Sequence, residues 1–255
     1  MGIATYTDLQ GRIAVVTGGS RGIGAATARA LAHNGAKVAV VGRDQDALDG
    51  VVAAIRAEGG TAIPAVADVT SEEQLAQVRE LVERELGAPT LLAAFAGGMG
   101  APQPTMDLAA VRWREIIETD LTAAFLTVQA FLPGMAAAGG GSIVTMASSA
   151  GRQPSRANAA YAAAKAGVVM FTRHLATELG PQGIRVNCLA PSSIRTEKVV
   201  RQMPAEVQRT VAAQHPLSRL GTPEDVAEAT LFLCSDASGW LSGLTIDVAG
   251  GRITN

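Results

Sequence analysis

Two side chains with acid–base capacity lie one helical turn apart in an alanine-rich run. Tyr161 and Lys165 are four residues apart in NAAYAAAKAG, residues 158–167, and residues at this spacing share one face of a helix. An ammonium beside a tyrosine hydroxyl favours the phenolate, which makes the tyrosine a usable proton donor and acceptor near neutral pH. The spacing is also common on helix surfaces, so a simple surface pair is the alternative interpretation.

A serine hydroxyl accompanies this pair. Ser148 lies thirteen positions before Tyr161, just after the apolar run at 142–146. Its hydroxyl would donate to a substrate carbonyl oxygen while Tyr161 supplies the proton. The alternative for Ser148 and its neighbour Ser149 is ordinary turn chemistry before Gly151.

A glycine-rich turn near the N-terminus predicts a phosphate site. TGGSRGIG, residues 17–24, joins an apolar strand-like run to a helical segment and contains Gly18, Gly22 and Gly24. Glycine permits a close backbone approach, and the helix behind it offers free N–H groups to a pyrophosphate. An isolated glycine pattern can be an ordinary tight turn, but its place after the first strand favours a dinucleotide site.

The end of the second apolar run indicates which dinucleotide binds. Dinucleotide folds that use NAD place an acid here, to hold the ribose 2′-hydroxyl. This chain has Gly42 and Arg43 instead, with Arg21 inside the glycine-rich turn as a second cation. Arginines make charge-assisted bonds to a 2′-phosphate, so we expect NADP(H), with NAD(H) as the alternative. We assign the nearby Asp44 to helix capping.

Apolar, β-branched runs alternate with helical segments along the whole chain. Runs without polar alternation are typical of strands buried on both faces of a parallel sheet. Because strands and helices alternate, we expect one doubly wound α/β domain over residues 1–255, with a parallel seven-stranded sheet and helices on both faces. The predicted strands are 12–17, 37–41, 62–66, 91–95, 142–146, 184–189 and 244–248.

Capping residues and amphipathic patterns predict the helices. Asp44 is expected to cap the helix that starts at Gln45, and either Thr70 with Glu73 or Ser71 with Gln74 forms a capping-box pattern before the next one. The predicted helices are 22–33, 45–57, one after 70–71, 109–137, 158–179, 204–214 and 223–233.

Composition excludes several classes of function. The net charge of −2 and the 4% of aromatic residues do not suit a nucleic-acid-binding surface. Cys188 and Cys234 are expected to be reduced core thiols, and the three scattered histidines form no metal-site spacing. The first residues do not resemble a signal peptide, and we expect no run of membrane-span length. A cytoplasmic protein without membrane or nucleic-acid partners is predicted.

Taken together, these residues resemble the short-chain dehydrogenase/reductase family over almost the whole chain. The resemblance is carried by TGGSRGIG at 17–24, DV at 68–69, Ser148 with YAAAK at 161–165, IRVNCLAP at 184–191 and IRT at 194–196. It implies a single Rossmann domain, commonly in a homotetramer with residues 247–251 near a subunit interface.

The resemblance also implies roles for individual residues. Asp68 and Val69 would contact adenine, Lys165 the nicotinamide ribose, and Ile194 with Thr196 the carboxamide. The catalytic set would be Ser148, Tyr161, Lys165 and Asp120. The cofactor would be bound by Gly18, Ser20, Arg21, Gly22, Ile23, Gly24, Arg43, Asp68, Val69, Ala96, Gly97, Tyr161, Lys165, Pro191, Ile194 and Thr196.

Three positions depart from the family pattern. Phe95 replaces the asparagine of the usual N-A-G after the fourth strand, Asp120 replaces an asparagine of the catalytic set, and Ser192 replaces the glycine of P-G. An ionised Asp120 cannot donate a hydrogen bond, which puts a proton relay through a bound water in doubt.

The expected reaction is hydride transfer between nicotinamide and a ketone or secondary alcohol. The substrate would lie against 97–102, 153–158 and 192–214, with a lid at about 192–220. The alternative substrate is a 3-oxoacyl group on acyl carrier protein, but the stretch 135–142 before the fifth strand has no basic residue, so a small or polyketide-like carbonyl is preferred. A non-catalytic dinucleotide sensor or scaffold is the alternative of another class, and a serine hydrolase lacks its G-x-S-x-G motif.

Overall fold

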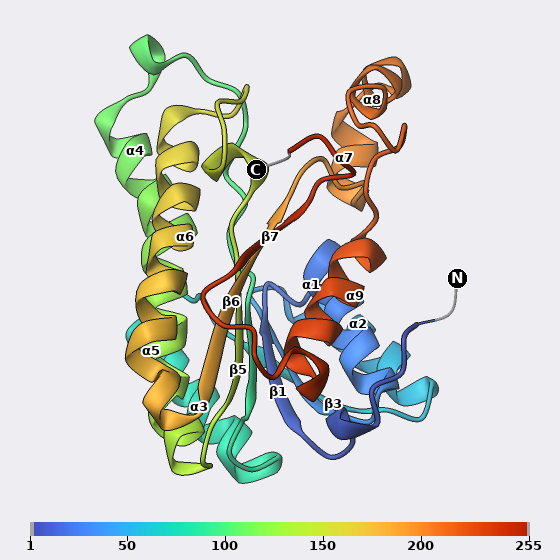
Figure 1. The fold of residues 1–255 in the computed structure, drawn as a ribbon, viewed down its shortest axis with the longest axis vertical. Helices are drawn as coiled ribbons and strands as arrows, with labels where there is room; N and C mark the ends of the chain where they lie inside the picture. The colour runs from blue at the N-terminus through green and yellow to red at the C-terminus, as the bar shows by residue number, and fades with distance from the viewer. Residues whose placement is uncertain (1–2, 254–255) are drawn as a thin grey trace.

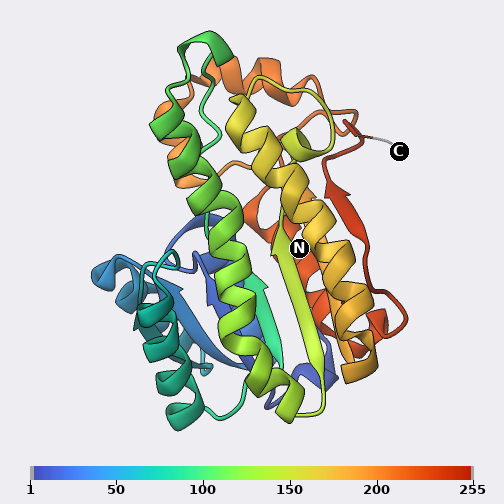
Figure 2. The same cartoon turned by 90° about the vertical axis from the view of Figure 1, so that its left-hand side faces the viewer.

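Seven apolar runs pair side by side as parallel strands in the order β3-β2-β1-β4-β5-β6-β7. The computed structural model describes residues 3–253, and Figures 1 and 2 show the sheet between two helical layers. The predicted doubly wound α/β fold is therefore confirmed. The strands are β1 (Ile13–Thr17), β2 (Lys37–Gly42), β3 (Thr61–Val66), β4 (Leu91–Ala94), β5 (Gly141–Met146), β6 (Ile184–Pro191) and β7 (Thr245–Val248).

The side chains of successive strand residues pack into two hydrophobic cores, one on each face of the sheet. Val16 packs in the cluster with α1, α2 and α9, whereas its neighbour Val15 packs in the cluster with α3, α5 and α6. The helices are α1 (Gly22–His33), α2 (Gln45–Ala57), α3 (Glu72–Glu85), α4 (Ala110–Ile117), α5 (Ala123–Ala137), α6 (Ala159–Leu179), α7 (Glu197–Gln202), α8 (Ala205–Ala212) and α9 (Pro223–Cys234).

The strand order reverses direction at β1, which lies between β2 and β4. Loops leaving the carboxyl ends of β1 and β4 therefore run to opposite sides of the sheet, and ligands of such folds bind in the crevice between them. In Figure 1, α7 and α8 and the loop before α4 extend beyond this end of the sheet. The short α7, which Thr196 caps by accepting from the Val199 amide at 3.3 Å, was not predicted.

The helix predicted over 109–137 is interrupted. α4 and α5 are joined by a π-helical turn, Glu118–Thr122, which holds more residues than an α turn. This turn directs Asp120 into the protein, where the residue is 1% exposed. Nothing in the apolar pattern of the sequence marks the change.

The same continuous segment, Ala110–Ala137, is long and apolar enough to cross a membrane by length and composition alone. It has 28 residues with a best-window mean hydropathy of 1.2, and 44% of that window is buried in this structure. The expectation that no run reaches this length was wrong by these two measures, although the segment contains charged residues such as Arg112, Arg114 and Glu115. In the fold, α5 packs against α3.

Capping chemistry explains two helix starts. Asp44 accepts from the Ala47 amide at 3.1 Å, which confirms its predicted capping of α2. Ser71 accepts from the Gln74 amide at 3.3 Å and caps α3, so the Thr70 alternative was wrong. The Thr70 hydroxyl instead donates to Asp68 at 2.7 Å.

Both cysteines are buried and free, as predicted. Burial raises the pKa of Cys234 to about 12, and it raises the pKa of Cys188 despite hydrogen bonds to that thiol. Both side chains therefore remain neutral thiols that pack in the core.

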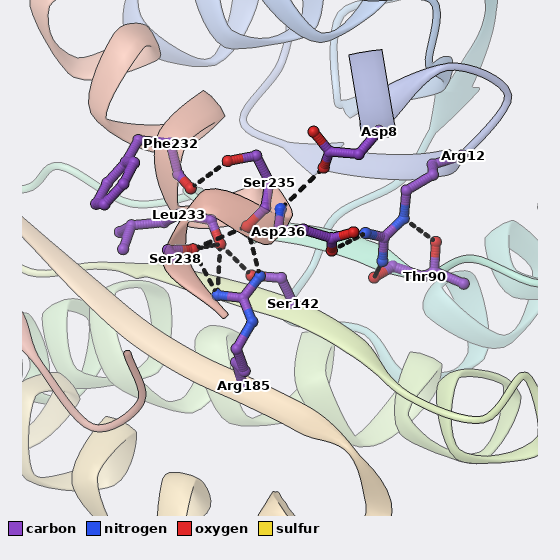
Figure 3. A network of polar contacts seen from close by, with 10 residues as sticks. All are labelled: Asp8, Arg12, Thr90, Ser142, Arg185, Phe232, Leu233, Ser235, Asp236 and Ser238. Carbon is purple, nitrogen blue, oxygen red and sulfur yellow. Dashed lines mark hydrogen bonds and ion pairs between the residues drawn. The ribbon is translucent and has the colours of Figure 1, made fainter. Parts of the chain in front are cut away.

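A polar network closes the end of the sheet where the strands begin (Figure 3). Arg185 of β6 donates to the Leu233 carbonyl at 2.8 Å, the Ser238 hydroxyl at 2.7 Å and the Ser235 carbonyl at 3.1 Å. The Ser142 hydroxyl of β5 donates to the same Leu233 carbonyl at 2.7 Å. These bonds satisfy carbonyls at the C-terminal end of α9, which have no partner within the helix.

We predict that Arg185→Met destabilises the fold and leaves the candidate site, at the opposite end of the sheet, unchanged. The substitution removes a cation that donates three hydrogen bonds, while the Ser142 and Ser238 hydroxyls still donate to the carbonyls. The free energy of unfolding should therefore fall by about 1–3 kcal/mol, measured by urea denaturation. The control is Arg84→Met, whose side chain is 64% exposed beside Glu85 and whose loss should change stability by less than about 0.5 kcal/mol. Equal effects of the two substitutions would contradict a structural role for Arg185.

Candidate functional site

The glycine-rich turn after β1 is shaped by close backbone contacts. Gly18 and Gly22 have φ of +67° and +54°, and a Cβ on Gly24 would lie 2.2 Å from the Gly18 carbonyl oxygen. Arg21, the residue before α1, makes no side-chain capping bond, so the first N–H groups of the helix are left for a ligand in the turn. The residues present therefore fit a pyrophosphate, which such a helix N-terminus binds.

The segment after β6 lies directly over this turn. A Cβ on Gly22 would meet the Thr196 methyl carbon at 3.1 Å, and Ile194 is buried and bridges to Gly221. The structure thus brings together two parts of the predicted cofactor site that are far apart in the sequence.

Two predicted phosphate-binding arginines flank the end of β2. Their side chains are 59% exposed for Arg21 and 77% exposed for Arg43. Arg21 forms an ion pair with Asp44, and Arg43 lies 3.7 Å from Asp68. Exposed pairs of this kind contribute little energy, so both cations remain available to a stronger anion.

The two acids of these pairs have other partners as well. The Ala47 amide and then Arg21 hold the pKa of Asp44 below its usual value. The Thr70 amide and hydroxyl, more than Arg43, hold the pKa of Asp68 below its usual value. Both carboxylates are therefore charged near neutral pH.

Tyr161 and Lys165 occupy the first turns of α6. Asn158 caps this helix by accepting from the Tyr161 amide at 2.8 Å. The Lys165 ammonium lies 5.6 Å from the centre of the Tyr161 ring and donates to the Met146 carbonyl of β5 at 3.1 Å. Lys165 is only 3% exposed, so the pair is not a solvated surface pair.

Ser148 follows β5 and is placed against the same helix. It caps the short turn Ser149–Gly151, where its hydroxyl accepts from the Ala150 amide at 3.2 Å. A Cβ on Gly151 would lie 2.5 Å from the Lys165 carbonyl carbon, so only glycine lets the turn pack this closely on α6. The turn therefore fixes Ser148 relative to the Tyr161–Lys165 face.

Asp120 completes this cluster from the π-helical turn. Its Oδ1 lies 3.1 Å from the Lys165 ammonium, and both side chains are almost entirely buried. Asp120 also accepts from the Gly98 amide at 2.6 Å and from the Met99 amide at 3.1 Å. As expected for a carboxylate, it only accepts hydrogen bonds.

Two positioning residues were missed in the sequence. Asn158 donates to the Met99 carbonyl at 2.9 Å and the Ala101 carbonyl at 3.0 Å, and its place before an apolar helical run was the available signal. Thr17 accepts from the amides of Phe95 and Ala96 at 3.1 and 3.3 Å. These bonds fix the backbone after β4, where Phe95 itself is buried in the core.

An open groove of about 570 Å³ lies at the start of α6, where Ala159 and Ala162 line it; Tyr161 is not one of its lining residues. Part of its lining, Pro102 and residues 154–157, belongs to two of the three predicted substrate walls, 97–102 and 153–158, and the rest lies just beyond them. Proline and alanine side chains alternate there with the polar side chains of Gln103, Thr105, Ser155 and Arg156. The lining residues are Pro102, Gln103, Pro104, Thr105, Pro154, Ser155, Arg156, Ala157, Ala159 and Ala162.

The third predicted substrate wall, residues 192–214, begins at a different cavity. Ser192 and His215 lie in a cavity of about 240 Å³ that extends to β7. The His215 ring bonds to the Ser192 hydroxyl at 3.0 Å and the Val211 carbonyl at 2.9 Å. The serine that replaces the family's glycine therefore anchors the base of the 192–220 segment.

Comparison with known proteins agrees with this arrangement. The family model described as enoyl-(acyl carrier protein) reductase matches residues 18–252. The chain is 42% identical over 240 residues to cis-4-hydroxycyclohexanecarboxylate dehydrogenase of Sinomonas cyclohexanicum, covering 94% of this chain and 96% of that protein. It is 36% identical to 3-oxoacyl-[acyl-carrier-protein] reductase of Pseudomonas aeruginosa, covering 96% and 98%.

Solved structures of similar proteins share the whole fold. The structure of 7α-hydroxysteroid dehydrogenase complexed with NADH and 7-oxo glycochenodeoxycholic acid superposes with a TM-score of 0.92 at 35% identity, covering 98% of this chain and 97% of that one. The fold, the glycine-rich turn and the matches along the full length lead to one assignment. The chain belongs to the short-chain dehydrogenase/reductase family and is an oxidoreductase of that family.

Proposed function

We propose that this enzyme interconverts a ketone and a secondary alcohol with NADP(H) as its preferred cofactor. The observation that carries the proposal is the buried Lys165 ammonium, 5.6 Å from the Tyr161 ring and hydrogen-bonded at the end of β5. The glycine-rich turn, with its positive φ angles and uncapped helix start, supports dinucleotide binding.

In this proposal a bound nicotinamide supplies or accepts the hydride. Tyr161 gives a proton to the substrate oxygen in reduction and takes it back in oxidation. The Ser148 hydroxyl donates to the same oxygen and orients it. Lys165 favours the phenolate of Tyr161 by its charge, and its position is fixed by Met146 and Asp120.

We propose a compact carbonyl on or beside a ring as the substrate class. The proline and alanine side chains that make up more than half of the groove lining support this, as do two relatives whose names describe hydroxyl groups on carbocyclic substrates. Arg156 at the groove gives a carboxylated substrate one cationic partner.

The second candidate is reduction of 3-oxoacyl groups on acyl carrier protein. Its specific support is the 36% identity to a reductase of that name over nearly the full length of both proteins. The stretch 135–142 before β5 has no basic residue to meet an acidic carrier protein, so this candidate ranks second.

The remaining parts of the proposal concern the lid and the assembly. The segment 192–220, anchored through His215 and Ser192, is proposed as the substrate lid. Exposed apolar side chains on α5, α6 and the loop before β7, among them Phe125, Met170 and Trp240, support self-association. We propose a cytoplasmic homotetramer.

Tyr161→Phe is predicted to abolish turnover while cofactor binding stays nearly intact. The substitution removes only the hydroxyl that transfers the proton, so kcat should fall by about 10²–10⁴-fold. NADPH oxidation with a panel of cyclic and linear ketones measures turnover, and fluorescence titration measures NADPH binding. Retained turnover in the variant would reject the assignment, and absence of turnover in the wild-type protein would favour a nucleotide sensor.

Gly151→Ala is predicted to reduce activity in a folded protein. The added methyl would meet the backbone of Lys165 and Ala166 at 2.5 and 2.7 Å, which pushes Ser148 away from Tyr161. Because small misplacements of catalytic groups are costly, kcat/KM should fall by about 10–100-fold. The control is Gly50→Ala on α2, where a Cβ meets nothing within 4 Å; activity there should not change.

Arg43→Ala is predicted to weaken NADPH binding far more than NADH binding. Losing a charge-assisted bond to the 2′-phosphate should raise the KM for NADPH by about 10-fold or more. Steady-state kinetics with both cofactors measure this selectivity, with Arg84→Ala as the matched exposed control. A wild-type enzyme that prefers NADH, or an Arg43 variant with unchanged selectivity, contradicts the proposed preference.

A further inference from the structure

Asp120 and Lys165 form an ion pair shielded from water. Their side chains are 0% and 3% exposed, with Oδ1 and Nζ 3.1 Å apart. A buried charge is stable only if it is paired and hydrogen-bonded. Each member has additional partners, since Lys165 donates to Met146 and Asp120 accepts two backbone bonds.

The partners of Asp120 require two accepting oxygens. Oδ1 accepts from the Gly98 amide at 2.6 Å and faces the Lys165 ammonium, and Oδ2 accepts from the Met99 amide at 3.1 Å. An asparagine has one accepting oxygen and one NH₂ group that only donates. In one orientation of an asparagine at position 120, its NH₂ group would face the Met99 amide. In the other orientation, it would face the Gly98 amide and the Lys165 ammonium, so it meets a donor in both.

The backbone of the 97–101 segment is adapted to this carboxylate. A Cβ on Gly97 would lie 2.5 Å from the Asp120 Oδ1, and Gly97 and Gly98 have φ of +137° and +112°. The segment also passes over the proton-transferring ring, because a Cβ on Gly100 would lie 2.8 Å from two Tyr161 ring carbons. The hydrogen bonds of Asp120 therefore hold a backbone segment that packs on the Tyr161 ring.

Within residues 3–253, Lys165 is the one charged side chain that forms an ion pair with Asp120. The 97–101 and 148–151 segments carry no titratable side chain. Cys188 on β6 is close enough for the charge of Lys165 to act on its pKa, but burial raises that pKa and keeps the thiol neutral. Other charged groups on α6 and on the elements packed against it are paired or exposed. They are Arg152 with Asp247, Arg112 with Glu115, His174 beside Glu178, Arg185 bonded at the opposite end of the sheet, and the exposed Arg114, Glu118 and Arg173.

We infer that Asp120 is a positioning residue whose carboxylate charge holds the 97–101 segment over Tyr161 and offsets the ammonium of Lys165. This role rests on the function proposed above, because it concerns the group that transfers the proton. Replacing Asp120 by asparagine, the residue usual in the family, is then a damaging change. It removes an acceptor from the segment and leaves the ammonium uncompensated, which favours the Tyr161 phenolate.

The test is a tyrosinate titration that needs neither substrate nor turnover. The chain has only two tyrosines, Tyr6 and Tyr161, so near-ultraviolet absorbance against pH gives two steps, and Tyr161→Phe identifies the step of interest. In Asp120→Asn the midpoint of that step should fall by about one pH unit, because a nearby negative charge has been removed. An unchanged or higher midpoint overturns the inference.

Two further variants separate charge from geometry. Asp120→Glu keeps the charge, so its midpoint should stay close to that of the wild-type protein. Asn158→Ala releases the 97–101 segment without changing any charge, so its midpoint should also stay unchanged while kcat/KM falls. If either midpoint falls as far as that of Asp120→Asn, loop position rather than charge sets the titration, and the inference fails.

Folding and activity are measured alongside. Circular dichroism establishes that Asp120→Asn folds, and Asp120→Ser, which is also neutral, replaces it with the same expected shift if it does not. With an active substrate, the pH at half-maximal alcohol oxidation should fall in Asp120→Asn by the same amount. If the wild-type protein oxidises no alcohol, the proposed function fails while the titration still decides the role of Asp120.

Discussion

The geometry of the candidate site depends on how a buried ammonium is satisfied. Lys165 is withdrawn from water and held by a carbonyl at the end of β5 and a carboxylate from the turn between α4 and α5. An uncompensated charge at this depth would cost several kcal/mol, so these three elements have to meet at one point. Their meeting point determines where Tyr161 lies relative to Ser148, and hence what chemistry the crevice can support.

The two ends of the sheet have different tasks. Where the strands begin, Arg185, Ser142 and their neighbours close the end of α9 with bonds that have no access to the crevice. Where the strands end, Gly24 and Gly151 pack so closely that a Cβ would lie 2.2 and 2.5 Å from neighbouring backbone atoms. Stability and function are thus carried by residues about one sheet length apart, which makes the effects of substitutions at the two ends separable.

Most of the fold could be predicted from the sequence because its signals are local. Apolar runs, Asp44 as a cap and the glycine-rich turn gave α1 and α2 with their observed bounds. The contacts of Asp120 with Gly98 and Met99, and of Ser192 with His215, depend on the three-dimensional fold and leave no periodic trace. The departure from the family pattern at position 120 could be seen in the sequence, but only the structure connects Asp120 to the backbone after β4.

The π-helical turn Glu118–Thr122 also has a consequence for reading this stretch of sequence. An α-helix advances about 100° per residue, and one surplus residue rotates everything downstream by that angle. The side chains of α4 and those of α5 therefore follow two different angular registers, and an apolar pattern averaged over both helices describes neither. Deleting one residue between 118 and 122 would give α4 and α5 a single register. It would also rotate either the Asp120 carboxylate or the whole of α5 away from its present neighbours.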